Sequence, residues 1–175
     1  MAFKQPVSEE CRVATNYVAS FELHISDAYL SMLVSPLSQA YSYPLDSVEP
    51  IFSGFFEDQA ELKREHGKQF LKYLVGRGNT ICLPVIKRPE VDNWQTGIKA
   101  LEYALELENQ LSQLLIDLKT IASADNDSHL LNFMKRFLDK QRKDINHLQH
   151  HIVYYNILEK EAQKQEELLK KAAEK

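Results

Sequence analysis

The sequence contains few residues that interrupt helices. Its 175 residues include only five glycines and six prolines. Most of them lie in two short zones, residues 36–50 and 76–89. This scarcity argues against an all-β fold and favours long uninterrupted helices.

Cysteine and long apolar runs are also scarce. The two cysteines, Cys11 and Cys82, are far apart and match no disulfide framework and no zinc pattern. Residues 1–6 lack the apolar core of a signal peptide, and no stretch reaches membrane-spanning length. We therefore expect no membrane partner and a cytoplasmic location with both thiols reduced.

An excess of basic residues is absent as well. The formal net charge is −4, which argues against a nucleic-acid partner because phosphate recognition needs clustered lysine and arginine. The hydrophobic fraction of 44% and the charged fraction of 26% are typical of a soluble globular protein. The length fits one domain with a core of its own.

Apolar residues recur at helical spacing in four segments. We expect helices from after Ser8 to near Ser35–Pro36, from Asp46 or Ser47 to about Val75, from near Asn93–Trp94 to about Ser123, and after a link over residues 124–128. Residues 79–92 form a long connection, either a strand or an extended crossover, whereas the other links are short. The pattern predicts an all-α four-helix bundle with one long crossover between the second and third helices.

The end of the sequence has a different composition. Residues 159–175 contain no glycine or proline, and glutamate and lysine are equally frequent. The apolar row there is thin: Leu158, Ala162, Leu169 and Ala172. We expect a bundle over residues 1–158 and a charged helical extension over 159–175, which is either a solvated helix or a weak coiled-coil seam.

The apolar rows of all four helices carry polar interruptions at one depth. The interrupting residues are Glu22, Lys63 with His66, Glu108 and Gln141. A buried unpaired carboxylate is costly, so each must pair, bind metal or lose its charge. Three hypotheses follow: an iron site, an internal ion pair with Lys63 between Glu22 and Glu108 and Gln141 beside it, or a single-metal site at His66.

Lys63 decides between the first two hypotheses. Bundles that bind two metals place Glu-x-x-His on a helix, whereas this helix carries Lys63-x-x-His66. An ammonium repels a cation by about 4 kcal/mol per unit charge at about 4 Å with an effective dielectric constant of about 20. The ion pair is therefore favoured over a two-metal centre.

Several motifs together carry a family resemblance. They are Glu22-Leu-His-Ile-Ser-Asp-Ala-Tyr29, Lys63-Arg-Glu-His66, Gly76-Arg-Gly78, Ile86-Lys-Arg-Pro89, Asp92-Asn-Trp94, Ala104-Leu-Glu-Leu-Glu108, Asn126-Asp-Ser-His-Leu130 and Gln141. Over residues 8–155 the chain resembles ferritin. The resemblance implies a ferritin-like bundle, iron storage and iron homeostasis.

The resemblance also implies roles for single residues. In heavy-type ferritins the positions of Glu22, Lys63, His66, Glu108 and Gln141 form the ferroxidase centre, with a tyrosine at Tyr29. A lysine at the bridging position resembles light-type subunits, which lack ferroxidase activity. We therefore expect a ferroxidase-deficient subunit that is not an enzyme.

Light-type subunits nucleate ferric mineral on carboxylates of the second helix. Of those positions Asp58, Glu61 and Glu65 remain acidic here. They share one helix face and suit Fe(III), although a plain solvated acidic face is the competing interpretation. The expected partners are iron ions and further subunits, in a 24-subunit cage built from this chain alone or with heavy-type subunits.

Three departures from the family pattern weigh against iron handling. Asn132 and Lys135 replace the acidic residues of the three-fold iron channel, with Lys119 nearby. The loop over residues 36–50 is longer than in the family. The short fifth helix is missing, and the charged extension replaces it, either converging on the four-fold axis or preventing closure of the cage. Two alternatives follow: a ferritin-derived structural or storage protein that handles no iron, and a residual ferroxidase in which Lys63 moves away or is neutral.

Overall fold

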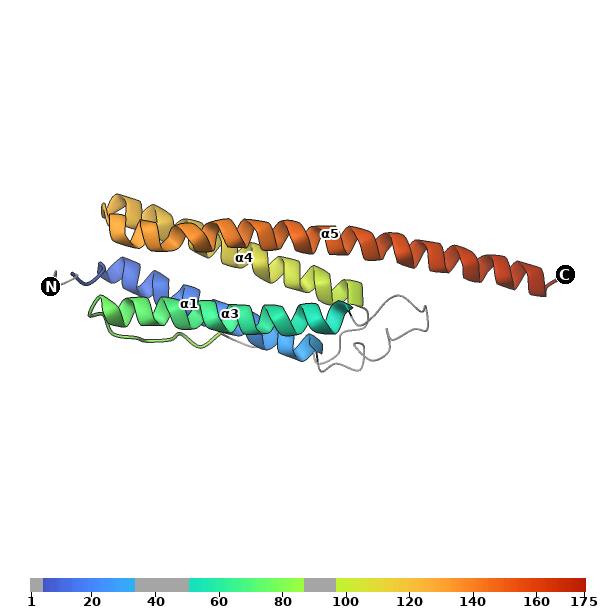
Figure 1. The fold of residues 1–175 in the computed structure, drawn as a ribbon, viewed down its shortest axis with the longest axis horizontal. Helices are drawn as coiled ribbons and strands as arrows, with labels where there is room; N and C mark the ends of the chain where they lie inside the picture. Colours follow the sequence, from blue (N-terminus) through green and yellow to red (C-terminus); the bar gives the residue numbers. More distant parts are fainter. Residues whose placement is uncertain (1–4, 34–50, 87–96) are drawn as a thin grey trace.

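Four long helices make up the described part of the chain. The computed structural model describes residues 5–33, 51–86 and 97–175. The helices are α1 (Glu9–Leu33), α3 (Ile51–Gly76), α4 (Gly97–Ala124) and α5 (Ser128–Ala173). Figure 1 shows α1 beside α3 and α4 beside α5, and α1 also packs on α4. The all-α four-helix bundle expected from the sequence is confirmed.

Helix α1 begins where the sequence predicts. The Ser8 hydroxyl accepts a hydrogen bond from the Cys11 amide at 3.2 Å, which caps the first turn. The row of residues at helical spacing that contains Glu22 is buried: Val18, Glu22, Ile25, Tyr29 and Met32. The period of 3.6 residues therefore predicted the buried face correctly.

Helix α3 crosses α1 closely and buries a mixed row. Phe56, Lys63 and Phe70 are buried, while Gln59, His66 and Tyr73 are half-buried at the edge. A Cβ added at Gly67 would lie 3.1 Å from the Leu23 side chain and 3.2 Å from the Ala19 carbonyl oxygen. Because Gly67 has no Cβ atom, α3 can pack this closely against α1.

Helices α4 and α5 form an antiparallel pair around the rest of the core. These side chains of the two helices are buried at helical spacing: Leu101, Glu108, Leu111, Leu115, Leu118, Leu130, Met134, Gln141, Leu148 and Tyr155. Asn126, at a φ of 55°, turns the short link between the two helices. Asp127 then caps α5 by accepting a hydrogen bond from the Leu130 amide at 3.1 Å.

Helix α5 continues past the other helices without a break. It runs for 46 residues and projects beyond the bundle (Figure 1). Residues 161–175 are exposed along their full length. The extension is helical and exposed in this chain, and the choice between a solvated helix and a weak coiled-coil seam stays a prediction.

The crossover and the loops are described in part. Residues 79–86 have no regular secondary structure, so the described part of the crossover is extended rather than a strand. The predicted helix starts at Asp46 or Ser47 and at Asn93–Trp94 fall outside the described residues, as does the whole 36–50 loop. No helix among the described residues is long and apolar enough to cross a membrane.

A buried arginine fastens the end of α3 to the start of α5. The Arg77 guanidinium donates to both carboxylate oxygens of Asp127, at 3.1 and 2.9 Å, and to the Tyr73 hydroxyl at 2.7 Å. Arg77 also donates to the Gln5 carbonyl oxygen. Because Asp127 is the cap of α5, one guanidinium joins three segments of the chain.

Replacement of Arg77 by alanine is expected to destabilise the bundle by about 3 kcal/mol, because Asp127 would remain half-buried without its partner. Denaturant unfolding at a fixed protein concentration measures the loss. Arg64→Ala removes an exposed charge from the same helix and is the matched control. Equal stability of the two variants would show that the clamp contributes nothing.

Candidate functional site: a closed polar cluster inside the bundle

The fold brings the predicted polar interruptions together in the middle of the bundle. Glu22 comes from α1, Lys63 from α3, Glu108 from α4 and Gln141 from α5, and they are 1%, 0%, 1% and 4% exposed. His66 lies one turn after Lys63 and has a side chain 13% exposed. The four helices therefore do point polar groups at one shared level.

Lys63 forms the centre of this cluster. Its Nζ donates to Glu108 Oε2 at 2.7 Å and to Gln141 Oε1 at 2.9 Å. Gln141 Nε2 in turn donates to Glu108 Oε2 at 2.6 Å and to the Glu108 carbonyl oxygen at 2.9 Å. Three side chains thus form a closed ring of hydrogen bonds with one positive and one negative charge.

Tyr29 completes the hydrogen bonding of Glu108. Its hydroxyl donates to Glu108 Oε1 at 2.9 Å, so both carboxylate oxygens have partners. Burial, and after it the Glu108 charge, raise the pKa of Tyr29 well above its ordinary value. Tyr29 therefore remains a protonated donor.

The charge on Lys63 is maintained by its partners. Burial by itself lowers the pKa of an ammonium, but the pKa of Lys63 is raised, chiefly by the Glu108 carboxylate. The ammonium fills the space between the helices with a permanent positive charge.

Glu22 differs from the sequence expectation. The expected ion pair placed Lys63 between both glutamates, but of these two carboxylates only Glu108 accepts a hydrogen bond from Lys63 in the described part of the chain. Glu22 Oε1 lies 4.0 Å from His66 Nδ1, and Glu22 Oε2 is buried with no hydrogen-bond partner among the described residues. Burial raises the pKa of Glu22 to about 8, so this side chain is largely protonated and uncharged at neutral pH.

His66 is uncharged for a related reason. Burial, followed by repulsion from Lys63, lowers its pKa to about 4. At neutral pH the cluster therefore contains one ammonium, one carboxylate and two uncharged side chains. In the described residues, no three side chains of the histidine, cysteine, aspartate and glutamate types are grouped so that they could hold a metal ion.

Asp144 belongs to the surroundings of this cluster and was missed by the sequence reasoning. It lies one turn after Gln141 on α5; Lys140 Nζ is 2.9 Å from its Oδ1, while its Oδ2 is buried without a hydrogen-bond partner in the described part of the chain. Its charge raises the pKa of both Glu22 and Lys63. The i,i+3 spacing from Gln141, which places both residues on one face of α5, was the available signal.

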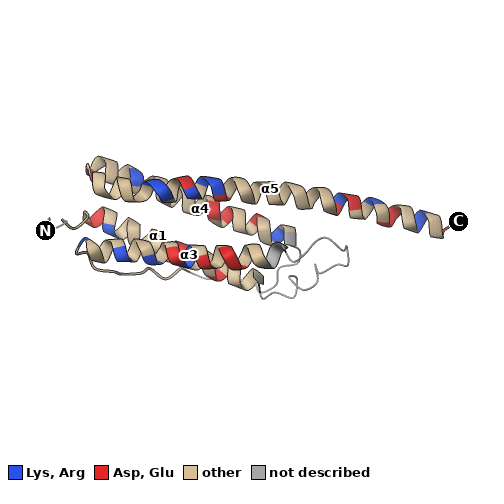
Figure 2. Cartoon of the chain, in the orientation of Figure 1, with Lys and Arg blue, Asp and Glu red and all other residues tan. Residues whose placement is uncertain are grey.

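The acidic residues of α3 lie on a different face from the cluster. Asp58, Glu61 and Glu65 are all exposed, and Figure 2 shows acidic residues along this part of α3. Glu65 lies 3.9 Å from Lys68 and accepts a hydrogen bond from Gln69 at 3.4 Å. We call these three residues the acidic stripe.

The two predicted channel positions lie near the start of α5. Asn132 and Lys135 are both exposed. Lys135 lines a surface hollow together with Lys119, Arg142 and one carboxylate, that of Asp139. The local charge of this surface is positive, which disfavours the approach of a cation.

Comparison with known proteins places these features in a family. A model of the ferritin-like domain matches residues 50–173. The oocyte isoform of ferritin light chain from Xenopus laevis is 35% identical over 151 residues, which cover 85% of this chain and 81% of that protein. Soma ferritin from Lymnaea stagnalis is 35% identical, covering 85% and 83%, and the middle subunit of ferritin from Salmo salar is 36% identical, covering 85% and 82%.

These matches correct one expectation and leave another as a prediction. Ferritin homologues are iron-oxidising enzymes, so the expectation that the chain is not an enzyme is wrong. A light chain, a soma ferritin and a middle subunit match at nearly the same identity, so identity does not assign the subunit type. The domain match also runs into the extension, and the boundary at residue 158 stays a prediction.

The topology, the polar cluster and the matched relatives agree with one another. Ferritins handle and store iron and form oligomeric cages. The chain therefore belongs to the ferritin family.

Proposed function

We propose that this chain stores iron as a light-type ferritin subunit, in which Lys63 takes the place of iron in the middle of the bundle. The observation that carries the proposal is the 2.7 Å contact between Lys63 Nζ and Glu108 Oε2, with Lys63 fully buried. The Lys63 ammonium would repel a metal ion at this level by about 4 kcal/mol per unit charge at a separation of about 4 Å.

Ferric mineral would instead grow on the acidic stripe. Its carboxylates are exposed, lie on one helix face and are the hard oxygen ligands that iron(III) oxides require. Iron oxidised within a 24-subunit cage, shared with heavy-type subunits, would be passed to this surface. The free thiols of Cys11 and Cys82 support a cytoplasmic location.

Two alternatives remain as outcomes of the tests. The positive surface of Lys119, Lys135 and Arg142 favours a structural or storage protein that handles no iron. The iron-oxidising activity of the family favours residual ferroxidase activity at or near the cluster. Total iron in the purified protein, together with electron microscopy of its assembly, separates the first alternative from iron storage.

Replacement of Lys63 by glutamate is expected to create an Fe(II) site, because it supplies the carboxylate of a Glu-x-x-His pair beside Glu22 and Glu108. Anaerobic calorimetry should show Fe(II) binding at least about tenfold tighter than in the wild type, which is about 1.4 kcal/mol. Lys72→Glu makes the same charge change at an exposed position of α3 and should gain nothing.

Fast oxidation of substoichiometric Fe(II) by the pure wild-type chain would contradict the closed cluster and support the ferroxidase alternative. An unchanged Fe(II) affinity in Lys63→Glu would also count against the interpretation of the cluster as a former iron site. Circular dichroism of each variant confirms that the bundle is retained.

Neutralisation of the acidic stripe is expected to slow ferric mineral growth several-fold, because the exposed oxygen ligands are lost. The triple variant is Asp58→Asn, Glu61→Gln and Glu65→Gln. The initial rate of Fe(III) deposition from externally oxidised iron, followed by light scattering, measures the effect.

The matched control neutralises three exposed carboxylates of α4 and leaves the stripe intact. Its changes are Glu102→Gln, Glu106→Gln and Asp117→Asn. If both triple variants deposit mineral at the same rate, the acidic stripe is only a solvated face.

Glu22 gives the cluster a pH dependence with a defined sign. In the folded chain its pKa is about 8, against an ordinary 4.5, so folding takes up a proton over that range and stability falls as pH rises through it. His66 acts in the opposite sense between its lowered pKa of about 4 and its ordinary 6.5. The effect of Glu22 is therefore isolated between pH 6.5 and 8.

Within that window Glu22→Gln is expected to become more stable relative to the wild type as pH rises, by up to about 1.4 kcal/mol per pH unit. Denaturant unfolding of both proteins at several pH values gives the difference. A difference that stays constant with pH would mean that Glu22 is already charged in the folded bundle.

A further inference from the structure

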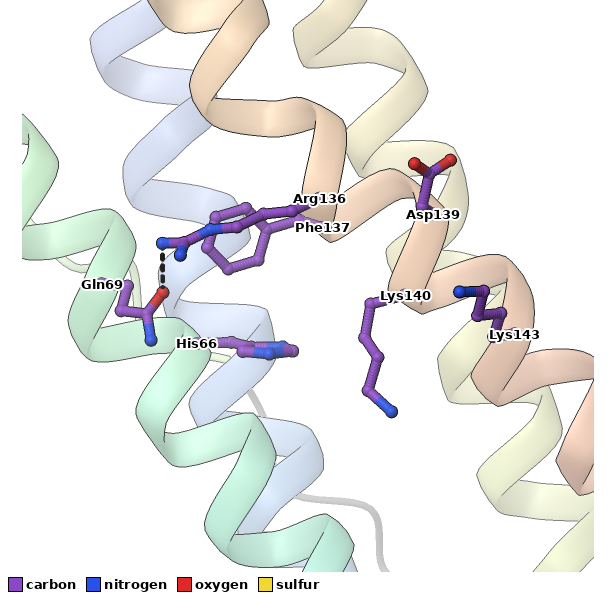
Figure 3. Close-up of a pocket in the computed structure, with 7 residues that line it drawn as sticks. All are labelled: His66, Gln69, Arg136, Phe137, Asp139, Lys140 and Lys143. Atoms are coloured by element: carbon purple, nitrogen blue, oxygen red, sulfur yellow. Dashed lines mark hydrogen bonds between the residues drawn. The ribbon is translucent and has the colours of Figure 1, made fainter.

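A pocket with basic walls opens at the seam between α3 and α5. It has a volume of about 430 Å³ and is lined by His66 and Gln69 of α3 and by Arg136, Asp139, Lys140 and Lys143 of α5 (Figure 3). His66 is the one member of the polar cluster that lines it. The pocket therefore lies at the mouth of the bundle interior but is a separate space.

The three cations share one stripe of α5. Arg136, Lys140 and Lys143 are spaced at i, i+4 and i+7, which places them on one helix face. Figure 3 shows Lys140 extending into the gap between the helices, opposite the His66 ring, with Lys143 farther along α5. All three are exposed, so their charges remain accessible to a ligand from solvent.

Arg136 is held in a fixed orientation at the rim. It donates to Gln69 Oε1 at 2.6 Å, and its guanidinium carbon lies 4.8 Å from the centre of the Phe137 ring and 5.7 Å from that of Phe133. These contacts use one side of the guanidinium and pre-order the group. Its remaining N–H groups are donors for a ligand at the pocket mouth.

The carboxylates near the pocket do not cancel its charge. Asp139, which also lines the pocket, pairs with Arg142 at 2.9 Å, and Asp144 pairs with Lys140 at 2.9 Å. Lys143 forms no hydrogen bond or salt bridge with any residue that the structure describes. Two positive charges, on Arg136 and Lys143, therefore remain without a carboxylate partner in the described residues.

We propose that this pocket is an oxyanion site that binds inorganic phosphate. A phosphate presents several acceptor oxygens, which match the planar fork of Arg136 and the ammonium groups of Lys140 and Lys143. The uncharged His66 ring can donate one further N–H. The same charges repel a cation that approaches the bundle interior from this side.

The site would lie next to the acidic stripe. Gln69, which accepts from Arg136, also donates to Glu65 of the stripe at 3.4 Å. A phosphate bound in the pocket would thus neighbour the carboxylates proposed to hold ferric ions, and could join a ferric phosphate deposit. Phosphate binding itself does not depend on iron; only this last role rests on the proposed function.

Calorimetric titration of the iron-free protein with sodium phosphate tests the proposal, at neutral pH in a chloride buffer of low ionic strength. We expect saturable binding of one phosphate per chain. The double variant Lys140→Gln/Lys143→Gln should weaken it by about tenfold for each charge removed. Lys164→Gln/Lys170→Gln removes the same charge from the exposed extension of the same helix and should leave the affinity within about twofold.

Two results would overturn the site. One is the absence of saturable phosphate binding to the wild-type chain, and the other is an equal loss of affinity in both double variants. The acidic-stripe triple variant should bind phosphate at least as tightly as the wild type. Mineral growth lost with phosphate binding retained would then count against the proposed function alone.

Discussion

The contact between Lys63 and Glu108 organises the middle of the bundle. A charge in the interior is tolerated when its partner is close and the remaining polar atoms are satisfied. Gln141 and Tyr29 supply those remaining hydrogen bonds, so α3, α4, α5 and α1 are tied at one level. The same pair leaves Glu22 without a hydrogen-bonded cation, and burial raises the pKa of Glu22 to about 8, so that it is largely protonated at neutral pH.

Two chemistries are separated on α3 by helix geometry alone. The inward face presents Lys63 and His66 to the bundle, and the outward face presents Asp58, Glu61 and Glu65 to solvent. Between them runs the seam with α5, where Arg136, Lys140 and Lys143 bring positive charge. One helix thus borders a neutralised interior, a basic pocket and an acidic surface.

Much of this arrangement follows from the sequence, and the remainder depends on distances that a pattern does not contain. The period of 3.6 residues identified the buried rows, and it placed Glu22, Lys63, Glu108 and Gln141 at one depth. The period did not predict that Lys63 donates a hydrogen bond to Glu108 and not to Glu22, because the position of the ammonium depends on the side-chain conformation. Asp144 was not predicted because the neighbouring Ile145 also fits an apolar row at helical spacing. The basic pocket was not predicted because its walls come from two helices.

The length of α5 has a mechanical consequence. A helix rises about 1.5 Å per residue, so the exposed part after Leu158 extends about 20 Å past the last core layer. This exposed helix acts as a spacer, because another molecule that contacts its end is held away from the bundle. A peptide tag or domain fused behind Lys175 would accordingly be carried clear of the bundle and would not disturb its packing.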